Sequence, residues 1–567
     1  MQTRSANGPE TPAVWQTVDW RQAHRNVRNL RRRIYRASRE NDHRKLRSLQ
    51  KLMLRSRSNA LRSVRQVTQV NKGRHTAGVD RMLVKTSEAK ARMVDRVLSH
   101  RTWQASPVKR VHIPKANGKL RPLGIPVIFD RAVQAVVRNA LEPEWEARFE
   151  PTSYGFRPGR GCHDAIGMIF GIARAGSRRR WVLDADIEGA FDNIGHDALL
   201  STIEGFPGRE LVRQWLKAGF VEKGSFHATD SGTPQGGVIS PLLANIALHG
   251  MEAAVGIKRI ARGDNVGARA LVRYADDFVV FCETEEDAIT AKGDLGRWLA
   301  TRGLRLSEAK TRVVHITQGF DFLGFNVRQY PNPNSSRTGW KLLIKPSRES
   351  VVRFKARMKE EWRLMEGQNA AALIARLNPI IRGWGNYYRH VVSKEVFALL
   401  DTWMFQQEVR WARKTYPLKP WYWLKKKCWG QHHPKRAAKW VFGTVEGGRS
   451  HKLIKLSWTP IERHVLVKKD ASPDDPMLQA YWDRRRRKRH EELPSRQKAL
   501  ARKQLGKCPQ CGETVHNDEC LHVHHHLARK AGGRDDFDNL RLMHWYCHIQ
   551  LHAREKEARR VRPRRRQ

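Results

Sequence analysis

The sequence predicts a multi-domain protein of the α/β plus α class, in which an α/β core is followed by helical segments and a small metal-bound unit. Three observations lead to this prediction. The chain has 567 residues, too many for one ordinary hydrophobic core. Short apolar runs separated by turns extend from residue 108 to about residue 327, as in an α/β core. Four of the seven cysteines lie at or beyond Cys508, which is metal-ligand spacing and not a disulfide framework.

Helical segments flank the predicted core. Residues 21–70 and 347–415 carry apolar side chains at spacings of three to four among many basic residues, a pattern typical of helices with one buried face. Residues 416–469 combine tryptophans with dense lysine and arginine, which predicts a nucleic-acid surface. Residues 471–476 are rich in Pro and Asp and predict a linker. A new unit is expected from about residue 496.

The charge of the chain indicates a polyanionic partner. Lys and Arg number 107 against 56 Asp and Glu, a formal net charge of +51. Phosphate contacts release condensed counterions, so this excess suits an extended nucleic acid better than a small acidic ligand. A merely solvated surface is the alternative, and it is disfavoured because charge of one sign repels itself.

No membrane partner is expected. The chain has no run of 18 apolar residues, and its first 15 residues lack the basic-then-apolar pattern of a signal peptide. The sequence therefore predicts a soluble protein inside the cell, in the bacterial cytoplasm or nucleoid, with an organelle as the alternative.

Two acidic segments of the core have the features of a polymerase metal site. Asp186 ends an apolar run, and Asp276 and Asp277 lie between two apolar arms that predict a β-hairpin with its turn at residues 275–277. Phosphoryl transfer to a primer uses two divalent cations about 3.5–4 Å apart and needs clustered carboxylates. An Asp pair taken alone is more often an exposed turn.

Residues 274–277, Tyr-Ala-Asp-Asp, resemble the signature turn of reverse transcriptases. Three further blocks, at 233–241, 304–311 and 322–325, follow in that family's order, the last matching the primer grip. The resemblance implies a right-hand polymerase of fingers, palm and thumb. It assigns two Mg²⁺ ions to Asp186 and Asp276, with Asp277 as a less certain ligand.

The same resemblance assigns residues to the deoxynucleoside triphosphate. Phe191 matches the steric gate that would clash with a 2′-hydroxyl, although core packing is the alternative. Gln235 matches the residue under the sugar. Lys119 and Arg121 lie on a predicted fingers hairpin and could reach the triphosphate, or be ordinary surface residues, and Lys310 is assigned to substrate binding in the 304–311 block.

Two segments narrow the resemblance to intron-encoded reverse transcriptases. Residues 71–80 resemble their extra N-terminal block, and residues 377–388 resemble the thumb motif called the maturase domain, which implies binding of group II intron RNA. Cations and rings suit structured RNA, although helix packing is the alternative for the rings, Trp384 above all. The expected RNA contacts are Arg382, Trp384, Tyr387, Tyr388 and Arg389.

The C-terminal unit contains a zinc ligand set. Cys508 and Cys511 form one pair with a two-residue gap, and His544 and Cys547 form another. Four such ligands suit tetrahedral structural Zn²⁺. The remaining Cys520 is unexplained by this set, and burial is the simplest expectation for it.

Histidines around this set resemble the HNH, or ββα-metal, nuclease motif. The resemblance implies a divalent cation, Mg²⁺ or similar, bound by His524, His548 and His552, with His525 as the general base and Asn539 orienting it. His548 and His552 are four apart, which places them on one helix face. The triple histidine at 524–526 leaves the register open by one, and the Gly pair at 532–533 favours His525 as the base.

The full interpretation is a group II intron-type protein that acts on intron RNA, double-stranded target DNA and deoxynucleoside triphosphates. It combines RNA-directed DNA polymerase, splicing assistance and second-strand nicking during intron mobility. One alternative is an RNA chaperone with vestigial enzymes, and another is a domesticated or defence-associated reverse transcriptase. The predicted units are an N-terminal helical extension of the fingers (1–107), fingers and palm (108–335), helical maturase thumb (336–418), basic DNA-binding connector and linker (419–495), and zinc-containing HNH domain with a basic tail (496–567).

Overall fold

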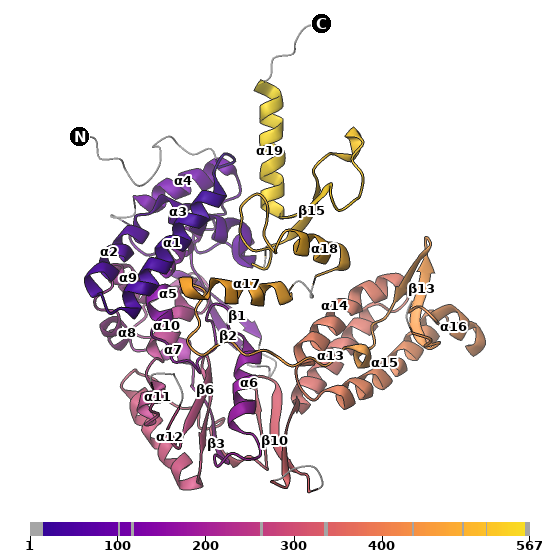
Figure 1. Ribbon diagram of the computed structural model, residues 1–567, viewed down its shortest axis with the longest axis horizontal. Coiled ribbons are helices and arrows are strands. Elements are labelled where there is room, and N and C mark those ends of the chain that lie inside the picture. Colours follow the sequence, from indigo (N-terminus) through magenta and orange to yellow (C-terminus); the bar gives the residue numbers. More distant parts are fainter. Residues whose placement is uncertain are drawn as a thin grey trace.

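The computed structural model describes residues 15–561 apart from short gaps at 100–102, 115–117, 119, 261–264, 334–337, 434–435, 490–492 and 518. Its N-terminal part is helical (Figure 1). The helical pattern with one buried face predicted for residues 21–70 corresponds to three helices. Each begins at a side chain that accepts a backbone N–H, namely Asp19, Asp42 and Ser56. The helices of this part are α1 (Trp20–Arg39), α2 (His43–Leu54), α3 (Arg57–Arg65), α4 (Ser87–Leu98) and α5 (Ile128–Glu146).

The fingers sheet follows these helices. Its strand order is β2-β1-β4-β5, with β1 and β2 antiparallel. Of the predicted hairpin turn at 117–118, residue 117 lies outside the described residues, and Gly118, between β1 and β2, has a φ of 77°. That left-handed conformation favours glycine. The strands are β1 (Val108–Pro114), β2 (Leu120–Ile125), β4 (Phe220–Glu222) and β5 (Ser225–His227).

The palm is a four-stranded antiparallel sheet of order β6-β7-β3-β8. Helices α6 and α12 contact its strands, and α7 to α11 connect the palm to the fingers. Its strands are β3 (Trp181–Asp186), β6 (Ala270–Tyr274), β7 (Asp277–Cys282) and β8 (Arg312–His315). Its helices are α6 (Cys162–Ile172), α7 (Ala190–Asn193), α8 (His196–Thr202), α9 (Arg209–Lys217), α10 (Ser240–Ala247), α11 (Met251–Ala254) and α12 (Glu285–Ala300).

A second antiparallel sheet, β9 (Phe320–Phe322), β10 (Phe325–Pro331) and β11 (Trp340–Pro346), leads into the thumb. The predicted unit boundary at 335/336 falls between β10 and β11, which pair along seven residues each. A boundary there would divide the β10–β11 hairpin. The two strands therefore belong to one unit, and the thumb helices begin after β11. They are α13 (Arg348–Leu364), α14 (Ala370–Tyr388) and α15 (Lys394–Thr415).

The tryptophan-rich connector begins with a small folded unit on the thumb. Its elements are α16 (Trp421–Cys428), β12 (Trp429–Gly430), β13 (Val441–Glu446) and β14 (Arg449–Lys452). Trp429 is buried, whereas Tyr422 is exposed. The aromatic rings of this segment therefore divide between core packing and surface.

The linker predicted at residues 471–476 is not an exposed tether. Ser472 and Asp474 are buried, and Asp474 forms an ion pair with Arg31 of α1 at 2.6 Å. The Trp482 indole N–H donates to the Ser472 carbonyl at 2.8 Å. Pro and Asp content predicted a loop, but composition could not show that a distant arginine would bind it.

The C-terminal module lies against the N-terminal helices (Figure 1). Arg28 of α1 pairs with Glu513 at 2.7 Å, and Gln550 donates to the Gln16 carbonyl at 2.6 Å. The strands of the module are antiparallel and precede its long helix. Its elements, with the preceding helix, are α17 (Gln479–Lys488), α18 (Ser495–Lys503), β15 (Leu521–His525), β16 (Leu540–His544) and α19 (Trp545–Val561).

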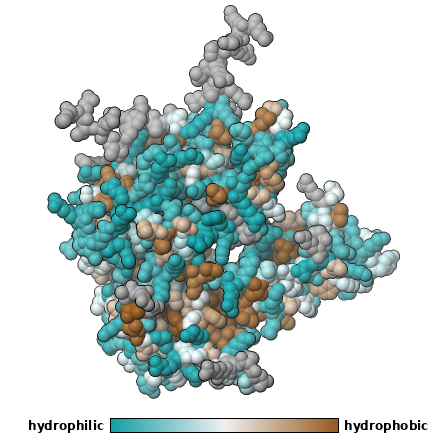
Figure 2. Space-filling view, in the orientation of Figure 1, coloured by the Kyte–Doolittle hydropathy of each residue, from teal (hydrophilic) through white to brown (hydrophobic). Residues whose placement is uncertain are grey.

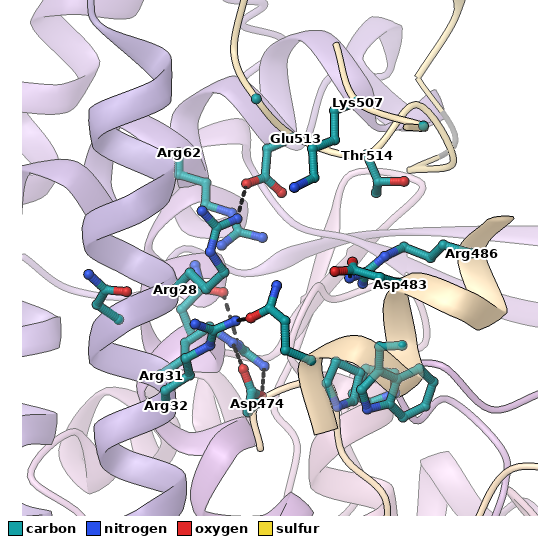
Figure 3. Close-up of a pocket in the computed structure, with 18 of the residues that line it drawn as sticks. Arg28, Arg31, Arg32, Arg62, Asp474, Asp483, Arg486, Lys507, Glu513 and Thr514 are labelled. Carbon is teal, nitrogen blue, oxygen red and sulfur yellow. Dashed lines mark hydrogen bonds and ion pairs between the residues drawn. The ribbon is translucent and has the colours of Figure 1, made fainter. Parts of the chain in front are cut away.

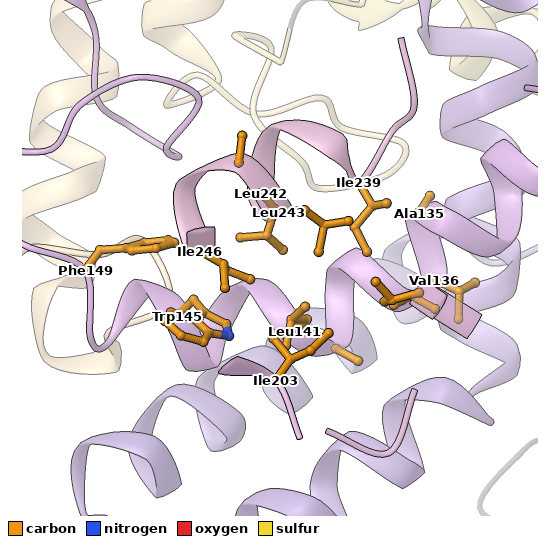
Figure 4. Close-up of a cluster of buried hydrophobic side chains, with 14 of the residues drawn as sticks. Ala135, Val136, Leu141, Trp145, Phe149, Ile203, Ile239, Leu242, Leu243 and Ile246 are labelled. Atoms are coloured by element: carbon orange, nitrogen blue, oxygen red, sulfur yellow. The ribbon is translucent and has the colours of Figure 1, made fainter. Parts of the chain in front are cut away.

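Two hydrophobic clusters hold these parts together. The larger runs from the N-terminal helices through α5 and α10 to Cys508, Cys511 and Cys547, and Figure 4 shows Leu141 and Trp145 of α5 facing Ile246 of α10. The second joins the palm to the thumb. Much of the face drawn in Figure 2 is hydrophilic. Within the described residues, none of the helices is both long and apolar enough for a membrane span.

Candidate active sites

The three palm carboxylates meet where β3 ends beside the β6–β7 hairpin. Asp186, the last residue of β3, is the register partner of Asp277, and Tyr274 pairs with Asp277 across the hairpin. The tight turn is therefore Ala275 and Asp276, one residue shorter than predicted, because Asp277 already belongs to β7. Lys310 forms an ion pair with Asp186.

The electrostatics of this cluster suit cations. Burial raises the pKa of Asp277 to about 7, and the carboxylates of Asp276 and Asp186 add to that rise. The pKa of Asp276 is also raised, mainly by burial and then by Asp186, while Arg121 opposes the rise. Bound cations stabilise such neighbouring anions. The donor set, oxygen atoms on a rigid sheet edge, therefore fits divalent metal ions.

Three residues that sequence reasoning missed hold the Ala275–Asp276 turn. A Cβ on Gly155 would lie 2.3 Å from the Ala275 nitrogen, so the two backbones touch. The buried Arg273 guanidinium donates to the Asn245 side-chain oxygen at 3.0 Å and to the Ala275 carbonyl at 3.2 Å. Burial lowers the pKa of Arg273 to about 10. No local pattern marks Gly155 or Asn245, because their partners are distant in sequence.

The predicted nucleotide residues differ in their surroundings. Phe191, on α7, is half-buried, and its ring is edge-on to Phe156 with centroids 6.0 Å apart. Gln235 donates to the Asp192 carboxylate at 2.9 Å. Arg121 is exposed on β2. Lys119 lies outside the described residues.

The thumb motif separates into packed rings and exposed cations. Tyr388 is buried, and its hydroxyl donates to the Gly324 carbonyl at 3.1 Å. Direct RNA contact through Tyr388 is therefore the wrong prediction, since the side chain instead supports the turn after β9. Tyr387 is half-buried and binds the Leu323 carbonyl at 2.9 Å, and Trp384 packs on Phe354 with centroids 4.8 Å apart.

The predicted cations of this motif differ in their surroundings. Arg382 is exposed on α14. Arg389 forms an ion pair with Glu462 of the connector. Within the described part of the chain, Arg382 therefore has no ion-pair partner, whereas Arg389 has one.

The nuclease histidines converge between β15 and α19. His524, His548 and His552 each offer a nitrogen, and these atoms lie within 4.8 Å of one another. Burial and neighbouring imidazoles lower the pKa of His548 to about 4, so its ring is neutral near pH 7. Neutral imidazoles are good metal ligands, and the set fits a divalent cation.

The predicted base and its orienting residue sit beside this set. His525 hydrogen-bonds to Asp535 at 2.6 Å, an acid that sequence reasoning missed. The Asn539 side chain accepts from the Leu527 N–H at 2.7 Å and donates to the Arg534 carbonyl at 2.8 Å. Asn539 therefore fixes the loop after His525, and its recorded hydrogen bonds do not reach the His525 ring.

The second metal-ligand cluster is buried. Cys508, Cys511, His544 and Cys547 present donor atoms within 4.8 Å of one another. His544 Nδ1 lies 3.3 Å from Cys511 Sγ, while its Nε2 is 3.1 Å from the Thr514 carbonyl. A proton on Nε2, donated to that carbonyl, would leave Nδ1 as a ligand. The set is consistent with zinc. Cys520 is exposed, contrary to expectation, and stands outside the cluster.

Family models match four consecutive parts of the chain. They are the N-terminal domain of reverse transcriptase (residues 15–97), reverse transcriptase, an RNA-dependent DNA polymerase (113–327), the group II intron maturase-specific domain (351–429) and HNH endonuclease (508–554). The chain belongs to the group II intron-encoded proteins with reverse transcriptase, maturase and HNH endonuclease domains. Its polymerase and nuclease domains imply the use of divalent metal, and its maturase domain implies binding of intron RNA.

Curated relatives agree with this membership. Protein YkfC of Escherichia coli is 37% identical, over 46% of this chain and 77% of the relative. The group II intron-encoded protein LtrA of Lactococcus lactis is 34% identical, over 47% of this chain and 55% of LtrA. Maturase-like protein 1 of Euglena gracilis is 24% identical, over 67% of this chain and 78% of the relative. The match thus spans about half of LtrA.

Proposed function

We propose that this group II intron-encoded protein copies its intron RNA into DNA at the palm site. Asp186 and Asp276 would hold two Mg²⁺ ions, with Asp277 as a further ligand. The observation that carries this assignment is the meeting of three carboxylates, from β3 and the β6–β7 hairpin, on one sheet edge. Magnesium there would supply Lewis-acid activation of the primer 3′-hydroxyl and clamp the triphosphate.

The residues around the carboxylates would select and position the nucleotide. Phe191 would exclude a 2′-hydroxyl, and Gln235, fixed by Asp192, would lie under the sugar. Arg121 already acts on the Asp276 carboxylate through space, so it is close enough for the triphosphate that would lie there. Lys119 and Lys310 complete the proposed cationic contacts. These residues bind and orient, which is the main protein contribution to phosphoryl transfer.

The C-terminal module would nick the second DNA strand. His525 would take the proton from water while Asp535 holds its ring, and Asn539 would keep the intervening loop in place. His524, His548 and His552 would hold Mg²⁺ or a similar cation, which would supply polarisation of the scissile phosphate. Cys508, Cys511, His544 and Cys547 would hold a structural Zn²⁺.

The combined activity would be intron mobility. The thumb would bind intron RNA through exposed cations such as Arg382, with Trp384, Tyr387 and Arg389 at its margin, and assist splicing. The excised intron would insert into one strand of double-stranded target DNA, and the nick in the other strand would prime copying. The connector, with exposed Tyr422 beside basic residues, is proposed to bind that DNA.

Asp276→Ala tests the polymerase assignment in the full chain purified with its intron RNA. We expect cDNA synthesis to fall below detection, since a metal ligand is lost, while intron splicing stays within about twofold, because the thumb surface is untouched. Asp184→Asn is the matched control, since Asp184 lies two residues before Asp186 but pairs with Arg312 at 3.1 Å. Retained cDNA synthesis in Asp276→Ala would refute the assignment. Loss of both activities would show that polymerase and splicing functions are not separable.

A further inference from the structure

A cavity of about 440 Å³ lies where three distant parts of the chain meet. Its walls come from the N-terminal helices with α5, from the connector at α17, and from the zinc-bearing module at residues 505–514. Figure 3 shows arginines of α1 and α3 facing Lys507 and Glu513 of the module across this space. None of the proposed polymerase or nuclease residues lines it.

The acidic residues of the cavity are already neutralised. Glu142 and Asp474 both pair with Arg31, at 2.7 and 2.6 Å. Glu513 pairs with Arg28, and Asp483 pairs with Arg486 at 2.6 Å. These four carboxylates therefore engage three of the seven basic residues that line the cavity.

The remaining four cations have no such partner within the described residues. Arg32 hydrogen-bonds to Gln479, and Arg138 donates to the neutral amide of Gln66 at 3.4 Å. Arg62 and Lys507 form no ion pair with a carboxylate in the described part of the chain, although Glu513 acts on Arg62 and Asp483 on Lys507 from a greater distance. The surplus positive charge thus spans both sides of the cavity, from α3 to the zinc-bearing module.

The crowding of these cations is unfavourable unless an anion joins them. Burial lowers the pKa of Arg62, and the positive charges of Arg31 and Arg138 add to that fall, although Glu513 opposes it. Burial likewise lowers the pKa of Arg32, with Arg28 and Arg486 contributing. Like charges held together in a partly desolvated space repel one another strongly.

We propose that this cavity is a phosphate-binding site that bridges the polymerase and nuclease parts of the chain. Guanidinium groups bind phosphate oxygens in pairs, with better geometry than a spherical anion offers. Trp482 supplies the aromatic ring in the cavity wall. The ring is buried and its N–H donates to the Ser472 carbonyl, so no base can stack on it. The site would therefore recognise the phosphate group alone, either a backbone phosphate of RNA or a free polyphosphate.

The test uses the full-length chain, freed of RNA, with inorganic pyrophosphate and no added magnesium. Calorimetry should show about tenfold weaker pyrophosphate binding for Lys507→Gln than for wild type, because a charged contact is lost. Lys507 is exposed, so this variant should fold, and its zinc content is measured alongside. Arg62→Gln, from the opposite wall, should weaken binding similarly.

Two further variants control for charge. Lys503→Gln removes an equal charge from the same module, but Lys503 pairs with Asp538 outside the cavity. The pyrophosphate affinity of this variant should therefore stay within about twofold of wild type. Asp483→Asn removes a carboxylate from the wall and should tighten binding by about threefold. Equal pyrophosphate affinity in Lys507→Gln, Lys503→Gln and wild type would weigh against the site.

A second arm identifies the source of the phosphate. Binding of a twelve-residue oligouridylate is followed by fluorescence anisotropy over a range of KCl concentrations. If the site takes a backbone phosphate, Lys507→Gln weakens this RNA and lowers the slope of log affinity against log salt by about one. If it takes free polyphosphate, only pyrophosphate binding falls. The proposal is overturned if Lys507→Gln and Arg62→Gln bind both pyrophosphate and the RNA as tightly as Lys503→Gln and wild type do.

Discussion

The consecutive histidines at 524–526 occupy three different environments although they share one strand end. His524 is buried and faces His548 and His552, with ring centroids 5.1 Å away in each case. His525, one position later, points to the other side of β15 and meets Asp535, as strand alternation requires. His526 is exposed. The structure therefore places His524 and His525 in different surroundings, which supports the proposal that His524 is a ligand and His525 the base.

This separation predicts the outcome of single substitutions in the histidine run. His525→Ala should reduce second-strand nicking by about a hundredfold or more, the usual contribution of a general base, while cDNA synthesis from a supplied primer is unchanged. His526→Ala is the matched control and should nick normally. Nicking is measured on end-labelled duplex DNA. A defect in His526→Ala with normal nicking by His525→Ala would shift the base by one residue.

At the scale of elements, the β6–β7 hairpin carries two of the three palm carboxylates, Asp276 on its turn and Asp277 at the start of β7. Other segments pack against this turn. Gly155 touches the backbone of Ala275, and Arg273 and Asn245 tie the turn to α10. Ala275 itself has a φ of 59°, a conformation that L-residues adopt only at a cost. The position of Asp276 thus depends on contacts with segments far away in the chain.

Gly155→Ala should therefore damage polymerisation without removing any carboxylate. A methyl group 2.3 Å from the Ala275 nitrogen cannot be relieved by a rotamer change, so the turn must shift. A displacement of about 1 Å at a catalytic group can cost roughly a hundredfold in rate. We expect such a loss in primer extension with intron RNA affinity retained, and Gly171→Ala, where a Cβ meets nothing within 4 Å, as the neutral control. Full activity in Gly155→Ala would mean that the turn tolerates the shift.

What the sequence predicted well were features whose chemistry is local. Asp276 and Asp277 lie between two apolar arms, and Cys508 and Cys511 form a spaced pair, so residue order alone pointed to them. Gly155, Arg273 and Asp535 escaped notice because each acts through a partner brought near by folding. The prediction for Tyr388 failed for the same reason. Its ring was predicted to contact RNA, but its hydroxyl donates a hydrogen bond to the carbonyl of Gly324, 64 positions away.

At the scale of the whole molecule, one contact between the C-terminal module and the N-terminal helices involves the cluster of Cys508, Cys511, His544 and Cys547 that is proposed to hold zinc. Arg65 of α3 is buried, donates to Cys547 Sγ at 3.3 Å and pairs with Glu519 at 3.2 Å. A cation beside a thiolate ligand stabilises its charged form and orients it. Metal retention and docking should therefore be coupled through this one arginine.

Removing the arginine tests that coupling. Arg65→Met should speed zinc release to a chromogenic chelator about ten- to a hundredfold, as loss of an outer-shell partner does, and increase hydrogen exchange in α3 and β16. Because Arg65→Met also leaves Glu519 buried without its partner, Arg65→Met/Glu519→Gln is made alongside. The double variant should regain thermal stability yet still release zinc quickly. Arg57→Gln, which removes an α3 arginine that pairs with Asp95 of α4, should match wild type. If the double variant released zinc at the wild-type rate, Arg65 would contribute to docking but not to metal retention.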